Sequence, residues 1–246
     1  PLPPSSAASD VYKRQTPSLS IADGTSTDEN SVTVVATLSA ASGRSVTVNA
    51  AASDGTATQG NDFNAFSSTV TFASGETTKS VSIPLINDSS DEDDETFTVT
   101  LSSANNATIS SATATATITD DDAPPALSIQ SVSVAENAGT ASLNVTLDAA
   151  SEKTITVDYV SSAGTACHCS SDFAAISSTT LTFTAGQTSK TISATISDDS
   201  VDEIDETFDI TLSNASNATI AVATGTVTIT DDDPAPTISV LSLIHI

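Results

Sequence analysis

The feature that most constrains this chain is a long internal repeat. Three consecutive aspartates at 120–122 recur at 231–233, after 111 residues. The acidic block before each triplet recurs at the same distance, at 87–95 and again at 198–206. A period of this length corresponds to a whole domain rather than to a short solenoid unit. The 246 residues therefore contain two copies of one domain, each large enough to bury its own core.

Both copies show the two-residue alternation of apolar and polar side chains that is typical of strands. The first copy alternates at Val81, Ile83 and Leu85, and the second at Ile192 and Ala194. A period of two buries one face of a strand and leaves the other in water. The strands predicted in the first copy, which the second copy repeats, lie at 18–21, 31–38, 45–51, 69–72, 79–86, 96–101 and 113–118. We therefore predict an all-β protein of two tandem seven-stranded antiparallel immunoglobulin-like β-sandwiches.

The charge of the chain restricts its partners. It has 31 Asp and Glu against 6 Lys and Arg, which gives a net charge of −25. Such a charge argues against nucleic acid and against an anionic membrane, and it favours cations or basic surfaces. No apolar run approaches the roughly 18 residues that span a bilayer. We expect no nucleic-acid partner and no direct membrane contact of this segment.

The two ends of the chain differ from the repeats. Residues 241–246 can be encoded by codons complementary to codons for residues 10–15. This shared element resembles a transposase end used in sequencing libraries, so we interpret both tails as adaptor-derived and give them no functional weight. Residues 237–240 resemble the opening of a third copy, and we expect the parent protein to be a longer array.

The expected organisation has six segments. They are an adaptor-derived tail at 1–15, a first domain at 16–122, a linker at 123–126, a second domain at 127–233, a linker with the start of a third repeat at 234–240, and an adaptor-derived tail at 241–246. Both linkers are rich in proline, which makes a joint of only a few residues semi-rigid.

Several separated motifs occur in the same order in both copies. The first copy has DGTA at 54–57, GNDF at 60–63, FASGE at 72–76 and DETF at 94–97. The second has GTA at 164–166, SDF at 171–173, FTAGQ at 183–187 and DETF at 205–208. With the aspartate triplets, these motifs resemble the Calx-beta domain, which occurs in sodium/calcium exchangers and in large bacterial surface proteins. The resemblance covers residues 16–240. It implies a pair of calcium-binding β-sandwiches in a fragment of a longer, membrane-associated surface protein, which we expect to be bacterial.

The acidic blocks have the chemistry of a calcium site. Calcium takes six to eight oxygen ligands at roughly 2.3–2.6 Å, which loop carboxylates and carbonyls can supply. The ends of the strands bring loops that are distant in sequence to one pole of a sandwich. The resemblance implies that the matching positions bind Ca²⁺. The candidate ligands of the first copy are Glu29, Asp62, Asp88, Glu92, Glu95, Asp120, Asp121 and Asp122. Those of the second copy are Glu136, Asp172, Asp198, Asp199, Glu203, Glu206, Asp231, Asp232 and Asp233.

Two departures and one alternative accompany these assignments. Asn87 stands where the second copy has Asp198, so the first site has lost a charge. Glu29 aligns with Glu136 only through a two-residue gap. The alternative is that the acids only decorate solvated loops. Carboxylates gathered at one pole repel by roughly 1 kcal/mol per close pair even in water, which favours a bound cation. Of the other acids, Asp91, Asp93 and Asp202 are expected to face solvent, and Asp94 and Asp205 either support a ligand or are solvated.

The sequence Cys167-His168-Cys169 stands where the first copy has Thr58-Gln59-Gly60. It lies just before Asp172, in a loop one residue longer than the corresponding loop of the first copy. A disulfide, free thiols and a metal site all remain open. One Cys-x-Cys with one His lacks the second ligand pair of a structural zinc site.

The motifs point to binding rather than to catalysis. Outside the tails, His168 is the only histidine, and no phosphate-binding glycine loop is present. We therefore predict no enzymatic activity. We expect a calcium-rigidified spacer or adhesion stalk, at the cell surface or in the extracellular space, with neighbouring repeats of the parent chain as partners. Two alternatives remain: a calcium-sensing regulatory domain, and the tip of an adhesin that binds a glycan or a protein through calcium.

Overall fold

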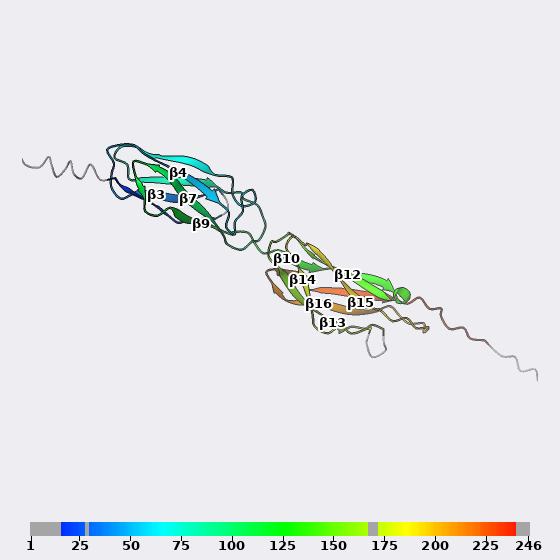
Figure 1. Ribbon diagram of the computed structural model, residues 1–246. Helices are drawn as coiled ribbons and strands as arrows, with labels where there is room; N and C mark the ends of the chain where they lie inside the picture. The colour runs from blue at the N-terminus through cyan, green and yellow to red at the C-terminus, as the bar shows by residue number, and fades with distance from the viewer. Residues whose placement is uncertain (1–15, 28–29, 167–171, 240–246) are drawn as a thin grey trace, which may run out of the picture. The chain divides into compact units, whose positions relative to one another are not determined.

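The computed structural model of the chain describes residues 16–27, 30–166 and 172–239. Contacts divide the chain into two compact units, which meet in the sequence between Asp122 and Ala123. Each unit is a sandwich of two β-sheets (Figure 1). Across the described ranges the only helical element is the 3₁₀ turn Glu136–Ala138 (η1), so no helix found there has the length and apolar character needed to cross a membrane.

The first domain consists of a four-stranded and a five-stranded sheet. The four-stranded sheet has the order β6 (Thr78–Pro84), β3 (Ser31–Leu38), β1 (Ser18–Ala22) and β8 (Thr108–Ile109). The five-stranded sheet has the order β2 (Gly24–Thr27), β9 (Thr113–Thr119), β7 (Glu95–Asn105), β4 (Val46–Ser53) and β5 (Ser67–Phe72). Alternate side chains of both sheets point inward and form one hydrophobic core, as the period of two predicts.

The second domain repeats this arrangement. Its four-stranded sheet has the order β15 (Ser189–Thr195), β12 (Thr140–Leu147), β10 (Ala126–Ile129) and β17 (Thr219–Val222). Its five-stranded sheet has the order β11 (Val132–Ala135), β18 (Thr224–Thr230), β16 (Glu206–Ser216), β13 (Ile155–Ala163) and β14 (Thr179–Phe183). A separate core fills the space between these two sheets.

The predicted fold class is confirmed, and the strands differ from the prediction in two details. The seven predicted strands of the first copy correspond to β1, β3, β4, β5, β6, β7 and β9. The additional strands are the short β2 and the two-residue β8. These two make parallel pairs, β2 with β9 and β8 with β1, so the sheets are not purely antiparallel. In the second domain, β11 and β17 make the same parallel pairs.

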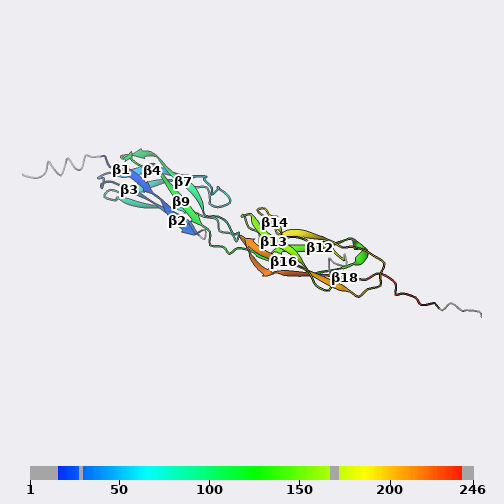
Figure 2. The same ribbon diagram turned by 90° about the horizontal axis from the view of Figure 1, so that it is seen from below.

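The division of the first strand has a steric cause. The chain crosses from one sheet to the other after Ala22, so that β1 pairs with β3 while β2 lies beside β9 (Figure 2). Gly24 stands at the crossing, where an added Cβ atom would collide with the carbonyl oxygen of Thr33. Only a residue without a side chain lets the two backbones approach this closely.

An aromatic stack packs within the core of each domain, close to its acidic loops. Phe63 and Phe97 stack with ring centroids 4.2 Å apart, and Phe173 and Phe208 stack at 3.9 Å. All four rings are buried. Because Phe63 directly follows Asp62 in the sequence, the stack anchors an acidic loop to the close-packed interior.

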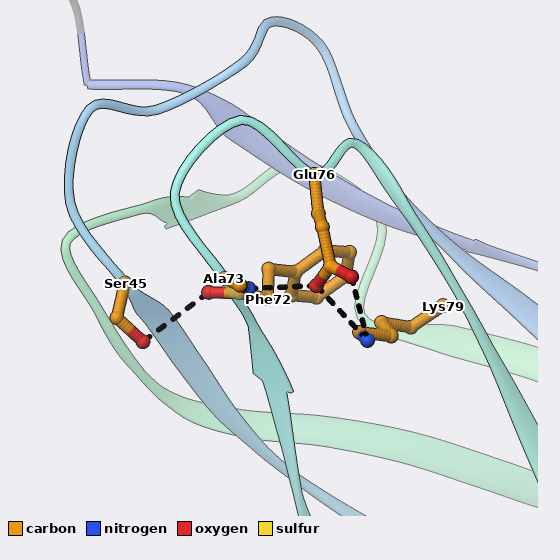
Figure 3. Close-up of polar contacts among 5 residues, drawn as sticks. All are labelled: Ser45, Phe72, Ala73, Glu76 and Lys79. Carbon is orange, nitrogen blue, oxygen red and sulfur yellow. Dashed lines mark hydrogen bonds and ion pairs between the residues drawn. The ribbon is translucent and has the colours of Figure 1, made fainter.

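The turn between β5 and β6 marks the opposite end of the first domain. The Glu76 carboxylate accepts a hydrogen bond from the Ala73 amide at 2.7 Å and pairs with Lys79 at 2.9 Å (Figure 3). This hydrogen bond and the Lys79 ammonium lower the pKa of Glu76. Arg44 lies in the neighbouring loop, in which the Ser42 carbonyl accepts a hydrogen bond from this turn. The cations of the domain are therefore at this pole, away from the acidic loops.

Candidate metal site

One pole of each domain gathers carboxylates from loops that are distant in sequence. In the first domain the Asp62 carbonyl accepts a hydrogen bond from the Ile86 amide at 2.9 Å. The Asp62 carboxylate accepts another from the Thr58 amide at 2.5 Å. In the second domain the Ser197 amide donates to the Asp172 carbonyl at 2.9 Å. These bonds hold each aspartate against the start of the acidic block, just after β6 or β15.

The first domain forms one close group of carboxylates. Oxygen atoms of Asp62, Glu92 and Glu95 all lie within 4.8 Å of one another. These three side chains line a small cavity with Asp88, Asp93 and Asp120, and its apolar wall comes from Ile86 and Ile118. Six carboxylates thus face one space that is large enough for an ion and too small for an organic substrate.

The second domain forms two such groups. Oxygen atoms of Asp172, Glu203 and Glu206 lie within 4.8 Å of one another, and so do those of Glu136, Asp231 and Asp233. One cavity is lined by members of both groups, together with Ile204 and Ile229. The two groups are therefore adjacent parts of a single site.

Glu136 enters this site from the 3₁₀ turn η1. It is one of the few buried charged side chains in the described part of the chain, with 7% of its surface exposed. Its Oε1 atom accepts a hydrogen bond from the Asp199 amide at 3.1 Å. Burial raises the pKa of Glu136, and this hydrogen bond opposes the shift. The turn thus ties the end of β11 to the acidic block.

Each aspartate triplet folds back on itself at the same pole. The Asp122 amide donates to Asp120 Oδ1 at 3.3 Å, and the Asp233 amide donates to Asp231 Oδ1 at 3.4 Å. The Oδ2 atoms of Asp122 and Asp233 are buried and have no hydrogen-bond partner among the described residues. A buried carboxylate oxygen without a donor is unfavourable, and a bound cation would satisfy it.

The charges at these poles repel one another. Burial is the main cause that raises the pKa of Asp122, and the carboxylates of Asp120 and Asp121 add to it. The pKa of Glu206 is raised to about 7, first by burial and then by the hydrogen bond and charge of Asp172. The Lys and Arg residues that the structure describes lie at the opposite poles; they are Arg44, Lys79, Lys153 and Lys190. Within each domain, the described basic side chains therefore lie at the pole opposite to that domain's own acids.

The structure brings most of the predicted ligands to these two poles. Asp62, Asp88, Glu92, Glu95 and Asp120 line the first cavity, and Glu136, Asp172, Glu203, Glu206 and Asp231 line the second. Asp122 and Asp233 lie beside these residues, with an oxygen atom buried. Asp198 and Asp199 are exposed, and their charges act on Asp233. Asp121 and Asp232 are exposed, and the Asn137 side chain donates to the Asp232 carboxylate.

The interpretation of Asp91 as a solvent-facing residue is wrong. Its side chain is buried, with 3% of its surface exposed. No signal in the sequence separates it from its counterpart Asp202, which is exposed as predicted. Asp93 is exposed but lines the first cavity. Asp94 supports the aspartate triplet, because its Oδ1 atom accepts a hydrogen bond from the Asp120 amide at 3.2 Å.

Two sequence predictions lie outside the described residues. They are the assignment of Glu29 as a ligand and the alternatives for Cys167, His168 and Cys169.

The donor set fits a hard divalent cation. The three close groups contain only Asp and Glu, and oxygen donors in loops of irregular geometry suit calcium. By fold and site, each domain is a β-sandwich with a carboxylate-lined pole whose acids could hold a metal ion. The chain belongs to the Calx-beta domain family, whose model matches residues 14–122 and 126–233.

Solved structures of tandem and single domains resemble this chain. One is a two-domain CBD12 structure from CALX1.2, with 18% identity over 86% of this chain and 99% of that chain, at a TM-score of 0.42. Another is the apo-form Calx CBD1 domain, with 30% identity over 44% of this chain and 98% of that chain, at a TM-score of 0.42. No curated protein matches the sequence. The family assignment rests on the two matches to the family model.

Proposed function

We propose that the chain is a calcium-binding tandem module, which acts by binding rather than by catalysis. The observation that carries this proposal is the buried Oδ2 atom of Asp122 and of Asp233, which has no hydrogen-bond partner in the described part of the chain. The described basic side chains of each domain lie at its opposite pole. A divalent cation would satisfy these oxygens and offset the repulsion among the carboxylates.

Calcium would stabilise each domain because the ligands come together only in the folded chain. An ion that binds only the folded state contributes about 2.7 kcal/mol when free calcium is a hundredfold above the dissociation constant. Asp62 lies in a loop and Glu95 begins β7, far away in the sequence, and the ion would hold these two segments together. Calcium would then act as a staple at one pole of the sandwich.

A calorimetric titration of the whole chain with calcium tests this proposal. We expect saturable binding that Glu206→Gln weakens at least about tenfold, because Glu206 belongs to a close carboxylate group. The matched control is Glu152→Gln, which removes the same charge from an exposed position at the opposite pole. Equal weakening by both variants would show diffuse charge screening rather than a site, and an absence of binding would reject the proposal.

We further propose that the module is a calcium-rigidified spacer or adhesion stalk in a longer extracellular or cell-surface protein. The aspartate triplet at 120–122 directly precedes the proline-containing joint at 123–126, so an ion there would restrict the start of the joint. The repeated domain supports this role, because tandem copies extend an array. Small-angle scattering with and without a chelator tests it: calcium should reduce flexibility, and identical curves would reject the spacer role.

The affinity separates the spacer from a calcium sensor. Dissociation constants of tens of micromolar to millimolar suit an extracellular staple, whereas sensors bind at about 10⁻⁷–10⁻⁵ M. The same titration therefore distinguishes the two roles. Binding of a glycan or a protein that disappears with a chelator would instead support an adhesin tip.

A further inference from the structure

The two acidic cavities differ at one position that lines both of them. Asp93 lines the first cavity, and Ile204, which follows Asp93 by 111 residues, lines the second. Both side chains are exposed, Ile204 to 79%. A side chain that is exposed and also lines a cavity stands at the opening of that cavity. The first cavity therefore opens beside a carboxylate, and the second opens beside an apolar side chain.

This difference changes the charge around each cavity. Six carboxylates line the first cavity and five line the second. The acidic blocks also differ in charge at Asn87 and Asp198, but neither of these residues lines a cavity. The position of Asp93 and Ile204 is thus one where a carboxylate lines one cavity and an apolar side chain takes its place in the other.

A cation at either cavity is favoured by an observation that is independent of this position. The Oδ2 atoms of Asp122 and Asp233 are buried and have no hydrogen-bond partner in the part of the chain that the structure describes. The Asp122 amide donates to Asp120, which lines the first cavity, and Asp233 forms a close carboxylate group with Asp231, which lines the second. An ion that satisfies these oxygens would lie near the residue at the opening of the cavity.

The two side chains would act differently on such an ion. An exposed carboxylate attracts a divalent cation through water, because a high dielectric constant weakens this attraction but does not remove it. The number of charged groups at a calcium site is one of the factors that set its dissociation constant. Isoleucine offers neither a charge nor an oxygen donor. Since the attraction crosses solvent, salt should screen it.

We propose that the position of Asp93 and Ile204 determines how tightly each cavity binds a divalent cation. Asp93 strengthens binding in the first domain, and Ile204 keeps binding in the second domain weaker than a carboxylate at that position would make it. This inference rests on the proposed calcium binding. It makes the affinities of the two repeats separately adjustable through a residue that lies outside the close carboxylate groups.

Calorimetric titration of the whole chain with calcium tests this proposal, one site at a time. Glu206→Gln weakens the second site so that the first can be measured, and Glu95→Gln does the converse. In these backgrounds we expect Asp93→Ile to weaken the first site about three- to tenfold and Ile204→Asp to strengthen the second by a similar factor. Both effects should shrink in about 1 M salt, where the screening length in water is about 3 Å.

Two control variants make the same changes of charge outside the cavity lining. Val201→Asp adds a carboxylate to the second block, and Asp202→Ile removes one, both at exposed positions that do not line the cavity. These controls should change the affinity clearly less than Ile204→Asp. Equal effects of controls and test variants, or no effect of either exchange, would overturn this inference alone. A parent chain that binds no calcium would overturn it together with the proposed function.

Discussion

The two domains build the same acidic pole from partly different residues. The first domain has Asn87 and a buried Asp91, and the second has Asp198 and an exposed Asp202. The second domain also has Ile204, which is 79% exposed, where the first domain has Asp93. Each domain keeps an apolar core beneath this pole, and a Glu76 or Gln187 side chain accepts a backbone hydrogen bond in the turn at the other pole. The comparison teaches that both copies keep an acidic pole, while the identity and the burial of single positions in it differ.

Removal of one ring from each aromatic stack should give the largest loss of unfolding free energy, and this loss should be equal in both domains. Phe97→Ala and Phe208→Ala each leave a cavity beside a buried partner ring, and such changes cost about 3–5 kcal/mol. Urea unfolding of the two variants measures the loss. A loss confined to one variant would break the equivalence of the two cores.

The next largest effect should come from adding a methyl group where both domains have a glycine in close contact with a neighbouring backbone. The Cβ atom of Gly55→Ala would collide with the Thr96 carbonyl oxygen, and that of Gly164→Ala would lie 2.5 Å from the Thr207 carbonyl oxygen. We expect each variant to lose about 1–3 kcal/mol of unfolding free energy, because backbone atoms cannot move aside cheaply. Gly43→Ala is the control, since its Cβ atom meets open space. Thermal melting measures the three variants. A melting temperature of Gly43→Ala that falls as far as those of Gly55→Ala and Gly164→Ala would contradict this account.

The stability of the calcium-free second domain should fall as the pH rises. The folded-state pKa of Glu206 is about 7, and the pKa of glutamate in an unfolded chain is about 4.3. A raised carboxyl pKa means that the folded state binds more protons, so its stabilising contribution is complete below pH 4.3 and is lost as the pH passes 7. The loss should be on the order of 1 kcal/mol, because water screens the site.

Melting of the chain in a chelator between pH 4.5 and 8 measures this dependence. Glu206→Gln should flatten it, while Glu152→Gln should leave it unchanged. Calcium binding requires ionised carboxylates, so the affinity should decrease as the pH falls below about 7. Stability that rises with pH through this range, without calcium, would contradict the assigned repulsion.

The smallest effect should come from the turn at the opposite pole. Gln187 of the second domain accepts a hydrogen bond from the Thr184 amide at 3.0 Å, as Glu76 does from Ala73 in the first. Glu76→Gln should therefore keep this hydrogen bond and lose only an exposed ion pair with Lys79. The melting temperature should shift less than for any variant above, and high salt should remove the shift. Gln187→Glu is the reciprocal variant in the second domain.

Much of the fold could be predicted because the sandwich follows directly from a period of two. Val81 and Ile83 of β6 and Leu85, which directly follows this strand, are buried as their alternation predicts. The additional strands β2 and β8 could not be predicted, since they depend on contacts between distant segments. Gly24 is an example: its role appears only where the crossing chain meets the Thr33 carbonyl.

The site could be predicted in part for a similar reason. The acidic blocks could be identified because they recur after 111 residues. The carboxylates of one domain meet because the strand ends bring their loops to one pole. The difference between Asp91 and Asp202 could not be predicted, because both have the same place in the block and only the path of the loop decides which is buried. The 3₁₀ turn that buries Glu136 is likewise a property of the folded chain.

The central claim is that the acids at each pole are held together by a divalent cation. The most direct test is thermal melting of the purified chain after removal of metal and again after calcium is restored. We predict that calcium raises the melting temperature, by several degrees for about 2.7 kcal/mol per site, and that magnesium is less effective. Identical melting with and without calcium would contradict the account.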